Sequence, residues 1–288
     1  MKKISIILTL FFVLVGFTLG LCGQTSTQKY PKTSRFYVSK KGICLTTKKG
    51  NADKWKARVD QFDVSWHYSW AGKLPEPEPD GVEFVPMIWG FWGASDGFLK
   101  LMDDLALQKS RGQTKHLLGF NEPDQKSQSN MSVERALKAW PHLMKTGLRL
   151  GSPGAVHPDN EWMQEFMRKA KEQNLRVDFV TMHWYGGPNA DSLIQRVKKV
   201  HQMYGKPIWI TEFAVGDWNA KSAAENRHSP QKVLRFMQEV LPRLDELDYV
   251  ERYCWFPAGE SNAALGTSAL FRKDGSLTPL GEFYKSHR

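Results

Sequence analysis

Two glutamates stand at the ends of short apolar stretches of the kind that form buried strands. Glu122 closes LLGFNEPD (residues 117–124), where Pro123 ends the run because proline cannot donate a ladder hydrogen bond. Glu212 lies near the end of PIWITEFAV (residues 207–215), which is rich in β-branched and aromatic residues. Barrel enzymes keep catalytic side chains at the carboxyl ends of strands, so the two carboxylates form a candidate acid/base and nucleophile pair. Either glutamate alone would be better interpreted as a surface or salt-bridged carboxylate.

The rest of the chain alternates between strand and helix patterns. Apolar runs predict strands at residues 41–46, 64–70, 82–89, 117–124, 149–156, 177–185, 207–215 and 250–256. Helical spacing predicts helices at residues 52–62, 96–109, 133–146, 160–173, 192–204, 230–247 and 278–286, with Ser132 as the cap of the third. With no linker or repeat, this alternation predicts an α/β fold, a single (β/α)8 TIM barrel formed by residues 40–288. A doubly wound sheet would need a nucleotide-type glycine loop after the first strand, and none is visible.

Residues 1–24 have the pattern of an export signal: two lysines, a long apolar run, then small and polar residues. The run of about 18 residues is long for a signal and could just span a bilayer. Leu21 precedes Cys22 where a lipoprotein signal usually has a small residue, so lipid attachment at Cys22 and ordinary cleavage beyond it both remain open. We expect a domain outside the cytoplasm, either secreted or in the cell envelope (periplasmic or lipid-anchored), with membrane contact only through such an anchor.

Positive charge is concentrated near the amino terminus. The formal net charge is +10, and much of the excess lies between Lys29 and Lys49, including a basic arm of residues 25–39. The arm could attract an anionic polymer or a membrane surface, or it could be a solvated segment. We favour the solvated segment and predict no nucleic-acid partner, because no nucleic-acid motif accompanies the charge.

Four short motifs together resemble a known enzyme family. GFNEPD, an earlier WHYSW, and the later HWYG and WITEFAV are similar to sequences of clan A glycoside hydrolases, and in particular of family 128, the endo-β-1,3-glucanases. NEP alone marks only the clan, whereas the combination is more specific, and the resemblance covers residues 41–284. It implies a retaining hydrolase of β-1,3-glucan of the laminarin or curdlan type, with Glu122 as acid/base and Glu212 as nucleophile.

The implied chemistry makes physical demands on the pair. Retention requires the two carboxyl groups about 5 to 5.5 Å apart, with Glu122 protonated near neutral pH and Glu212 ionised. Asn121 resembles the clan asparagine that binds the sugar 2-hydroxyl; the alternative is a residue that caps the turn at the strand end. No cofactor is predicted, because neither a phosphate-binding glycine loop nor a zinc-type spacing is present.

His183 and Tyr185 lie two residues apart on one predicted strand and therefore share a face. If that face points inward, both could donate hydrogen bonds to Glu212 and orient it. The adjacent Trp184 and the strand-end position favour a site role over a satisfied core histidine. We do not expect His183 to bind a metal, because no second histidine or cysteine stands at ligand spacing.

Aromatic side chains are candidates for stacking on sugar rings, since the chain has 11 tryptophans. Trp255 resembles the platform that many clan A enzymes place under the sugar to be cleaved. The other candidates are Trp66, Tyr68, Trp70, Trp89 and Trp218. Trp66 and Trp89 are equally well interpreted as barrel packing, whereas Trp218, in a long polar loop, is the better exposed candidate.

Three alternatives stay open. The hydrolase could act on another β-glycan, β-1,4 or mixed-linkage, or the chain could be a non-catalytic glucan-binding barrel. Cys44 and Cys254 lie in the first and last predicted strands, which closure would make neighbours, so a disulfide is possible, but two buried free thiols are expected. A monomer is the default expectation.

Overall fold

Parallel strands alternate with helices in the computed structural model, which describes residues 39–47, 52–74 and 81–288. The strands are β1 Lys41–Cys44, β2 Trp66–Tyr68, β3 Glu83–Phe84, β4 His116–Leu117, β5 Arg149–Leu150, β6 Val180–Trp184, β7 Ile208–Phe213 and β8 Val250–Trp255. The α-helices are α1 Ala52–Val59, α2 Asp96–Ser110, α3 Val133–Lys145, α4 Glu161–Glu172, α5 Ala190–Tyr204, α6 Pro230–Asp245 and α7 Pro279–Ser286. Two short 3-10 helices, η1 Ala223–Glu225 and η2 Gly266–Ser268, complete the described elements.

The strands form two parallel sheets. One has the order β3-β2-β1-β8-β7-β6, and the other pairs β4 with β5. Single parallel bridges join Met87 to Leu118 and Gly151 to Phe179, between the edges of the two sheets. The predicted α/β class with parallel strands is therefore confirmed, although the ladders do not form one continuous closed ring.

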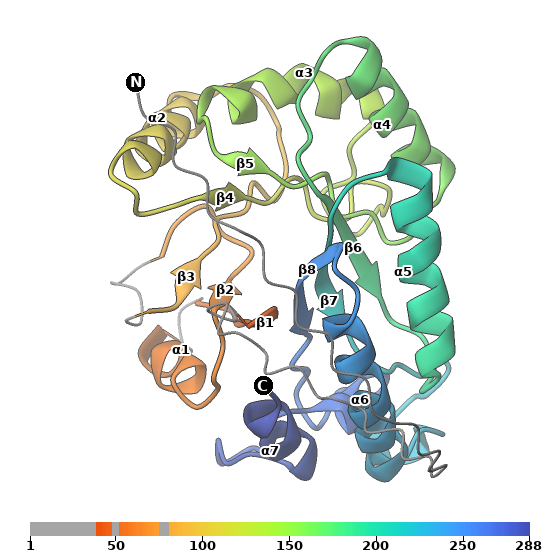
Figure 1. Ribbon diagram of the computed structural model, residues 1–288. Coiled ribbons are helices and arrows are strands. Elements are labelled where there is room, and N and C mark those ends of the chain that lie inside the picture. The colour runs from red at the N-terminus through yellow and green to blue at the C-terminus, as the bar shows by residue number, and fades with distance from the viewer. Residues whose placement is uncertain (1–38, 48–51, 75–80) are drawn as a thin grey trace, which may run out of the picture. The chain divides into compact units, whose positions relative to one another are not determined.

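Helices lie around the outside of the strands, as Figure 1 shows for α2 to α6. The outer faces of the strands and the helices form an apolar layer of two clusters, one that includes Ile43, Ile210 and Phe236 and one that includes Leu117, Trp140 and Leu150. The opposite strand faces form an inner layer of large side chains: Cys44, Trp66, Tyr68, Phe179, Trp209 and Cys254. Alternation along each strand thus separates a helix-facing layer from an inner one.

The helices begin at polar caps that the sequence supplies. The Ser132 hydroxyl accepts a hydrogen bond from the Arg135 N–H at 3.2 Å, so the predicted cap of α3 is confirmed. Lys40 and Lys41 donate hydrogen bonds to the carboxyl-terminal ends of two helices. The Lys40 ammonium donates to the carbonyl of Asp245, the last residue of α6, at 2.9 Å, and the Lys41 ammonium to the Tyr284 carbonyl, in the last turn of α7, at 2.9 Å. Part of the basic amino-terminal charge is therefore built into the fold, where it complements helix dipoles.

Several predictions fall on residues that the structure does not describe. These are the export signal of residues 1–24, lipid attachment at Cys22, and the basic arm except for Ser39. Among the described residues, no helix is both long and apolar enough to cross a membrane. Cys44 and Cys254 are both buried and free, as expected.

The amino-terminal half of the inner space contains two ion pairs. Arg252 on β8 donates to Glu83 on β3 at 2.5 Å, and Arg149 on β5 forms two hydrogen bonds to Glu251 on β8 at 2.6 and 2.8 Å. Neither pair joins strands that are neighbours in a sheet. The two pairs therefore bridge the interior, and the second connects one sheet to the other.

Candidate active site

A cleft of about 1150 Å³ lies at the carboxyl ends of the strands. Residues that end or follow all eight strands line it, among them Thr46, Trp70, Trp89, Glu122, His157, His183, Glu212 and Phe256. Loops at this end of parallel strands can vary without disturbing the core, so it is where a functional site is expected. The structure brings Glu122 and Glu212 to this cleft from β4 and β7.

The backbone at Glu122 is held in an unusual conformation. Its φ is +42°, in the left-handed region that few residues other than glycine adopt. Hydrogen bonds hold it on both sides: the Glu122 N–H donates to the Gly154 carbonyl at 2.8 Å, and the Gln125 N–H donates to the Glu122 carbonyl at 3.0 Å. Strain of this kind persists only where neighbouring structure fixes it, and it is concentrated at functional sites.

Glu212 is buried within β7 and is surrounded by neutral donors. Oε1 accepts hydrogen bonds from the Trp70 indole N–H at 2.7 Å and the Tyr68 hydroxyl at 3.1 Å, and Oε2 accepts one from the Tyr185 hydroxyl. Burial and the charge of Glu212 raise the pKa of both tyrosines well above the usual range, so both hydroxyls keep their protons. The three donors hold both oxygens of the Glu212 carboxylate in place. The hydrogen bond expected from Tyr185 is present, whereas those from Tyr68 and Trp70 were not predicted.

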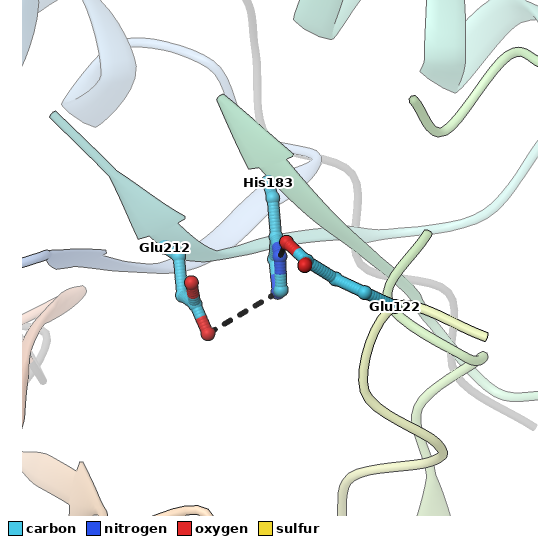
Figure 2. Close-up of side chains that lie close together, drawn as sticks. All are labelled: Glu122, His183 and Glu212. Carbon is cyan, nitrogen blue, oxygen red and sulfur yellow. Dashed lines mark hydrogen bonds and ion pairs between the residues drawn. The ribbon is translucent and has the colours of Figure 1, made fainter. Parts of the chain in front are cut away.

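His183 lies between the two carboxylates (Figure 2). Its Nδ1 is 2.9 Å from Glu122 Oε1, and its Nε2 is 3.6 Å from Glu212 Oε1. The prediction that His183 donates to Glu212 is therefore wrong in its partner: the hydrogen bond goes to Glu122, and Glu212 is the more distant neighbour. Burial lowers the pKa of His183, but the charge of Glu212 and the contact with Glu122 outweigh it and raise that pKa above the ordinary value.

The carboxyl groups of Glu122 and Glu212 are close enough to act on one bond. One ligand atom from each of Glu122, His183 and Glu212 lies within 4.8 Å of the others. Of the described residues, these three could also hold a metal ion, through two carboxylate oxygens and one ring nitrogen. The hydrogen bond between His183 and Glu122 and the ion-pair contact between His183 and Glu212 already account for the proximity. A pair of neighbouring carboxyl groups is sufficient for metal-free glycoside hydrolysis.

Aromatic side chains form much of the cleft wall. Of the predicted residues, Trp70, Trp89, Trp184, Tyr185 and Trp218 line it, as do Asn121 and His183. Trp218 is 62% exposed, consistent with its place in the loop after β7, and its indole donates to the Tyr185 carbonyl at 3.1 Å. These tryptophans offer flat faces of the kind that stack on sugar rings.

Three predicted aromatic residues do not line the cleft. Trp66 and Tyr68 belong to the buried inner layer beneath it, and Tyr68 reaches the site only through its hydroxyl. Trp255 is completely buried in the helix-facing layer, where its indole donates to the Ser268 carbonyl at 2.8 Å and its ring packs on Phe213. The prediction of Trp255 as a sugar platform is therefore wrong, because the inner and outer faces alternate along β8 and Trp255 lies on the outer one.

Phe256, the next residue, lines the cleft instead. Its ring lies 5.8 Å from that of Trp70 and 5.6 Å from that of Tyr185, both edge to face. Because side chains alternate between the two faces of a strand, Phe256 shares a face with Cys254 in VERYCWF. Cys254 was expected to lie near Cys44, and an inward Cys254 implies that Phe256 also points inward. The sequence prediction selected Trp255 because of its resemblance to the family platform, although Phe256 is the residue on the inward face.

Polar side chains complete the wall beside Glu122. Asn121 is buried, its amide group donates to Gln128 at 3.3 Å, and its Oδ1 has no hydrogen-bond partner among the described residues. Asp124 accepts from the Val156 N–H at 3.0 Å and from Asn160 at 2.6 Å, so it ties the loop after β4 to the start of α4. Asn121 therefore has an unpartnered acceptor buried beside Glu122, whereas Asp124 supports the loop.

Comparisons with known proteins identify the family of the chain. The family model described as "Glycosyl hydrolase catalytic core" matches residues 42–284. A family 128 (subgroup I) endo-β-1,3-glucanase from Amycolatopsis mediterranei, solved with laminarihexaose, is 32% identical with a TM-score of 0.71, over 86% of this chain and 99% of that one. A subgroup III curdlan-specific exo-β-1,3-glucanase from Blastomyces gilchristii, solved with glucose, is 31% identical with a TM-score of 0.65, over 86% and 98%.

A curated relative matches over a shorter stretch. Alkali-sensitive linkage protein 1 of Schizosaccharomyces pombe is 36% identical over 182 residues, which is 59% of this chain and 32% of the relative. The chain thus spans about a third of that protein's length. From the match to almost the whole described domain, the chain belongs to the glycosyl hydrolase catalytic core family and to glycoside hydrolase family 128.

Proposed function

We propose that this glycoside hydrolase cleaves β-1,3-glucan with retention of configuration, with Glu122 as acid/base and Glu212 as nucleophile. The observation that carries the proposal is that one carboxyl oxygen of Glu122 and one of Glu212 lie within 4.8 Å of each other in one cleft. Retaining enzymes have their carboxyl groups about 5 to 5.5 Å apart, whereas inverting enzymes leave about 6.5 to 9.5 Å for a water molecule.

The different surroundings of the two glutamates support the division of roles. Glu212 accepts three hydrogen bonds from neutral donors, which suits a carboxylate that must stay ionised to attack. Glu122 contacts His183, with which it can share a proton, and its side chain is 13% exposed against 6% for Glu212. The better solvated carboxyl group suits the residue that exchanges protons with the leaving group and then with water.

His183 couples the two carboxyl groups. In the first step Glu122 gives its proton to the departing oxygen, and in the second it takes a proton from water. With Nδ1 protonated, His183 can donate to Oε1 of Glu122 in both states, which leaves the other carboxyl oxygen to carry and exchange the acid proton. Asn121, which lines the cleft next to Glu122, is proposed to bind the sugar hydroxyl adjacent to the reacting carbon.

The substrate assignment is supported by relatives rather than by geometry alone. Solved family 128 proteins that resemble this chain are described as endo- or exo-β-1,3-glucanases, some in complex with laminari-oligosaccharides. The aromatic walls of the cleft suit a neutral polysaccharide. Hydrolysis of another β-glycan remains the second candidate.

We also propose that the strands form a single (β/α)8 barrel and that the chain is exported and monomeric. The bridges between the sheet edges support the barrel, as do ion pairs between strands that are not sheet neighbours, such as Arg149 with Glu251. Export rests on the signal pattern of residues 1–24, and mass spectrometry of the exported protein would decide whether Cys22 carries lipid.

Proton NMR of the purified protein acting on a soluble linear β-1,3-glucan tests the proposed reaction. We expect the β-anomer of the new reducing end to appear first, and a Glu212→Gln control to release nothing. An early α-anomer would contradict retention. Cleavage of a β-1,4 or mixed-linkage glucan instead would contradict the substrate, and binding without cleavage of any glucan would indicate a glucan-binding barrel.

A further inference from the structure

Trp70 has a strained backbone and faces Glu212 across the cleft. Its φ is +57°, and among the described residues that line the cleft only Trp70 and Glu122 combine a positive φ with a side chain. The adjacent backbone is held on both sides: the Leu45 N–H donates to the Tyr68 carbonyl at 3.1 Å, and the Met87 N–H donates to the Ala71 carbonyl at 3.0 Å. The turn after β2 is therefore fixed in a conformation that a tryptophan would not adopt by preference.

The indole N–H of Trp70 is devoted to one acceptor. It donates to Oε1 of Glu212 at 2.7 Å, whereas the Tyr68 hydroxyl lies 3.1 Å from the same oxygen. The single hydroxyl proton of Tyr68 has two acceptors, the Thr211 carbonyl at 3.0 Å and Glu212 Oε1 at 3.1 Å. Edge-to-face packing on Tyr68 and Phe256 fixes the indole plane. Trp70 is thus the better directed donor to Oε1.

The two oxygens of Glu212 differ in their surroundings. Oε1 accepts hydrogen bonds from Trp70 and Tyr68 and lies 3.6 Å from Nε2 of His183, whereas Oε2 accepts a hydrogen bond from the Tyr185 hydroxyl. We infer, on the basis of the proposed function, that Trp70 is a positioning residue that anchors Oε1 of Glu212 and leaves Oε2 as the attacking oxygen.

The charge on Glu212 changes in both steps of the reaction. In the first, an Oε2 lone pair forms a bond to the anomeric carbon, the glycosidic C–O bond breaks, and the departing oxygen takes the proton of Glu122. In the second, water adds to the anomeric carbon, the bond to Oε2 breaks with its electron pair returning to Glu212, and Glu122 takes the water proton. A donor on Oε1 stabilises the carboxylate more than the neutral ester, because charge-assisted hydrogen bonds are the stronger ones.

Loss of this N–H should therefore slow the second step and spare the first. The test measures steady-state and burst kinetics of the purified protein on 4-nitrophenyl β-laminaribioside. For Trp70→Phe we expect kcat to fall about tenfold, kcat/KM to stay within about twofold, and a burst of nitrophenol to appear or grow. Trp70→His is smaller than tryptophan but retains a ring N–H, and it should keep kcat nearer that of the wild type than Trp70→Phe does.

Trp89→Phe is the matched control, since Trp89 lines the cleft without a hydrogen bond to Glu212. It should lower kcat/KM through KM and produce no burst. Circular dichroism establishes folding, and Trp70→Met, which also lacks an N–H and needs less space, replaces Trp70→Phe if that variant does not fold.

The outcomes separate the two proposals. A wild-type protein that releases no nitrophenol and cleaves no β-1,3-glucan overturns the proposed function and this inference with it. An active wild type whose Trp70→Phe variant loses kcat and kcat/KM equally, without a burst, overturns the inference alone. The same holds if Trp70→His and Trp70→Phe behave alike.

Discussion

The ion pair between Glu83 on β3 and Arg252 on β8 should make the fold sensitive to acid. Burial would raise the pKa of Glu83, but His116 and Arg252 outweigh it and lower that pKa from 4.5 to about 2. His116 Nδ1 lies 2.7 Å from one carboxylate oxygen, and Arg252 lies 2.5 Å from the other. The side chain of Glu83 is only 16% exposed, so solvent screens these contacts little.

The direction of the pH dependence of stability follows from the lowered pKa of Glu83. Because the folded pKa is depressed, the contribution is complete above about pH 4.5 and is lost as the pH falls towards 2. A difference of about 2.5 pH units corresponds to about 3 kcal/mol of unfolding free energy. Glu83→Gln removes this dependence, and it also leaves Arg252 buried without its counter-charge, which should destabilise the fold by about 3 to 5 kcal/mol at neutral pH.

Urea unfolding followed by tryptophan fluorescence from pH 2.5 to 7 would measure both effects. Other carboxylates titrate in both proteins, so the difference between wild type and Glu83→Gln isolates this one. Glu134→Gln is the control, because Glu134 pairs with Lys169 on an exposed surface and its removal should change the profile far less. Wild-type and Glu83→Gln stabilities that vary in parallel with pH would refute the reasoning.

The remaining predictions concern the site. Glu212→Gln should abolish turnover of every substrate, whereas Glu122→Ala should lower kcat/KM on glucan by about 10² to 10⁴ and spare the first step on activated aryl glycosides; equal loss on both substrates would contradict the roles. The pKa of His183 is raised above 6.5, so its charge stabilises the fold below pH 6.5, and this contribution is lost as the pH rises through the folded pKa. The unfolding free energy of His183→Asn, measured between pH 6 and 9, should therefore lack that decline. A decline equal to that of the wild type would contradict the role of the His183 charge. Trp255→Leu should destabilise the fold by about 2 to 4 kcal/mol without changing KM, while Phe256→Ala should raise KM for oligosaccharides with less effect on stability, and the reverse pattern would restore Trp255 as the platform.

The sequence was sufficient for the order of the elements and for the two glutamates. Apolar runs ended by breakers located the strands, and the helix caps lay where polar residues precede amphipathic runs, as at Ser132. The lengths of β3, β4 and β5 were overestimated, because only two residues in each form a ladder and the pairing continues as isolated bridges such as Asn121 with Gly154. The left-handed backbone at Glu122 ends the extended run there, and no residue type announces it.

The missing parts of the site depend on distances between segments that are remote in sequence. Trp70 and Tyr68 lie more than 140 residues before Glu212, and nothing in either segment alone indicates that they donate to one oxygen. His183 illustrates the same limit: its strand face was predicted, but which carboxylate its Nδ1 meets depends on the relative heights of β4, β6 and β7. Trp255 shows a different limit. Side chains alternate between the two faces of a strand, so an error of one residue in the assumed register assigns every side chain to the wrong face.

Trp70 and Glu122 bring these points together. Both stand just beyond the end of a strand, both have a positive φ, and both present a polar group to the reacting carboxyl pair. Neither conformation helps the fold by itself, since a left-handed residue other than glycine or asparagine is disfavoured. The strain is explained if it directs the proposed acid/base on one side and the indole donor on the other. Relief of either strain should therefore stabilise the protein while displacing a group that the chemistry needs, which is the trade-off expected of an active site and not of a structural turn.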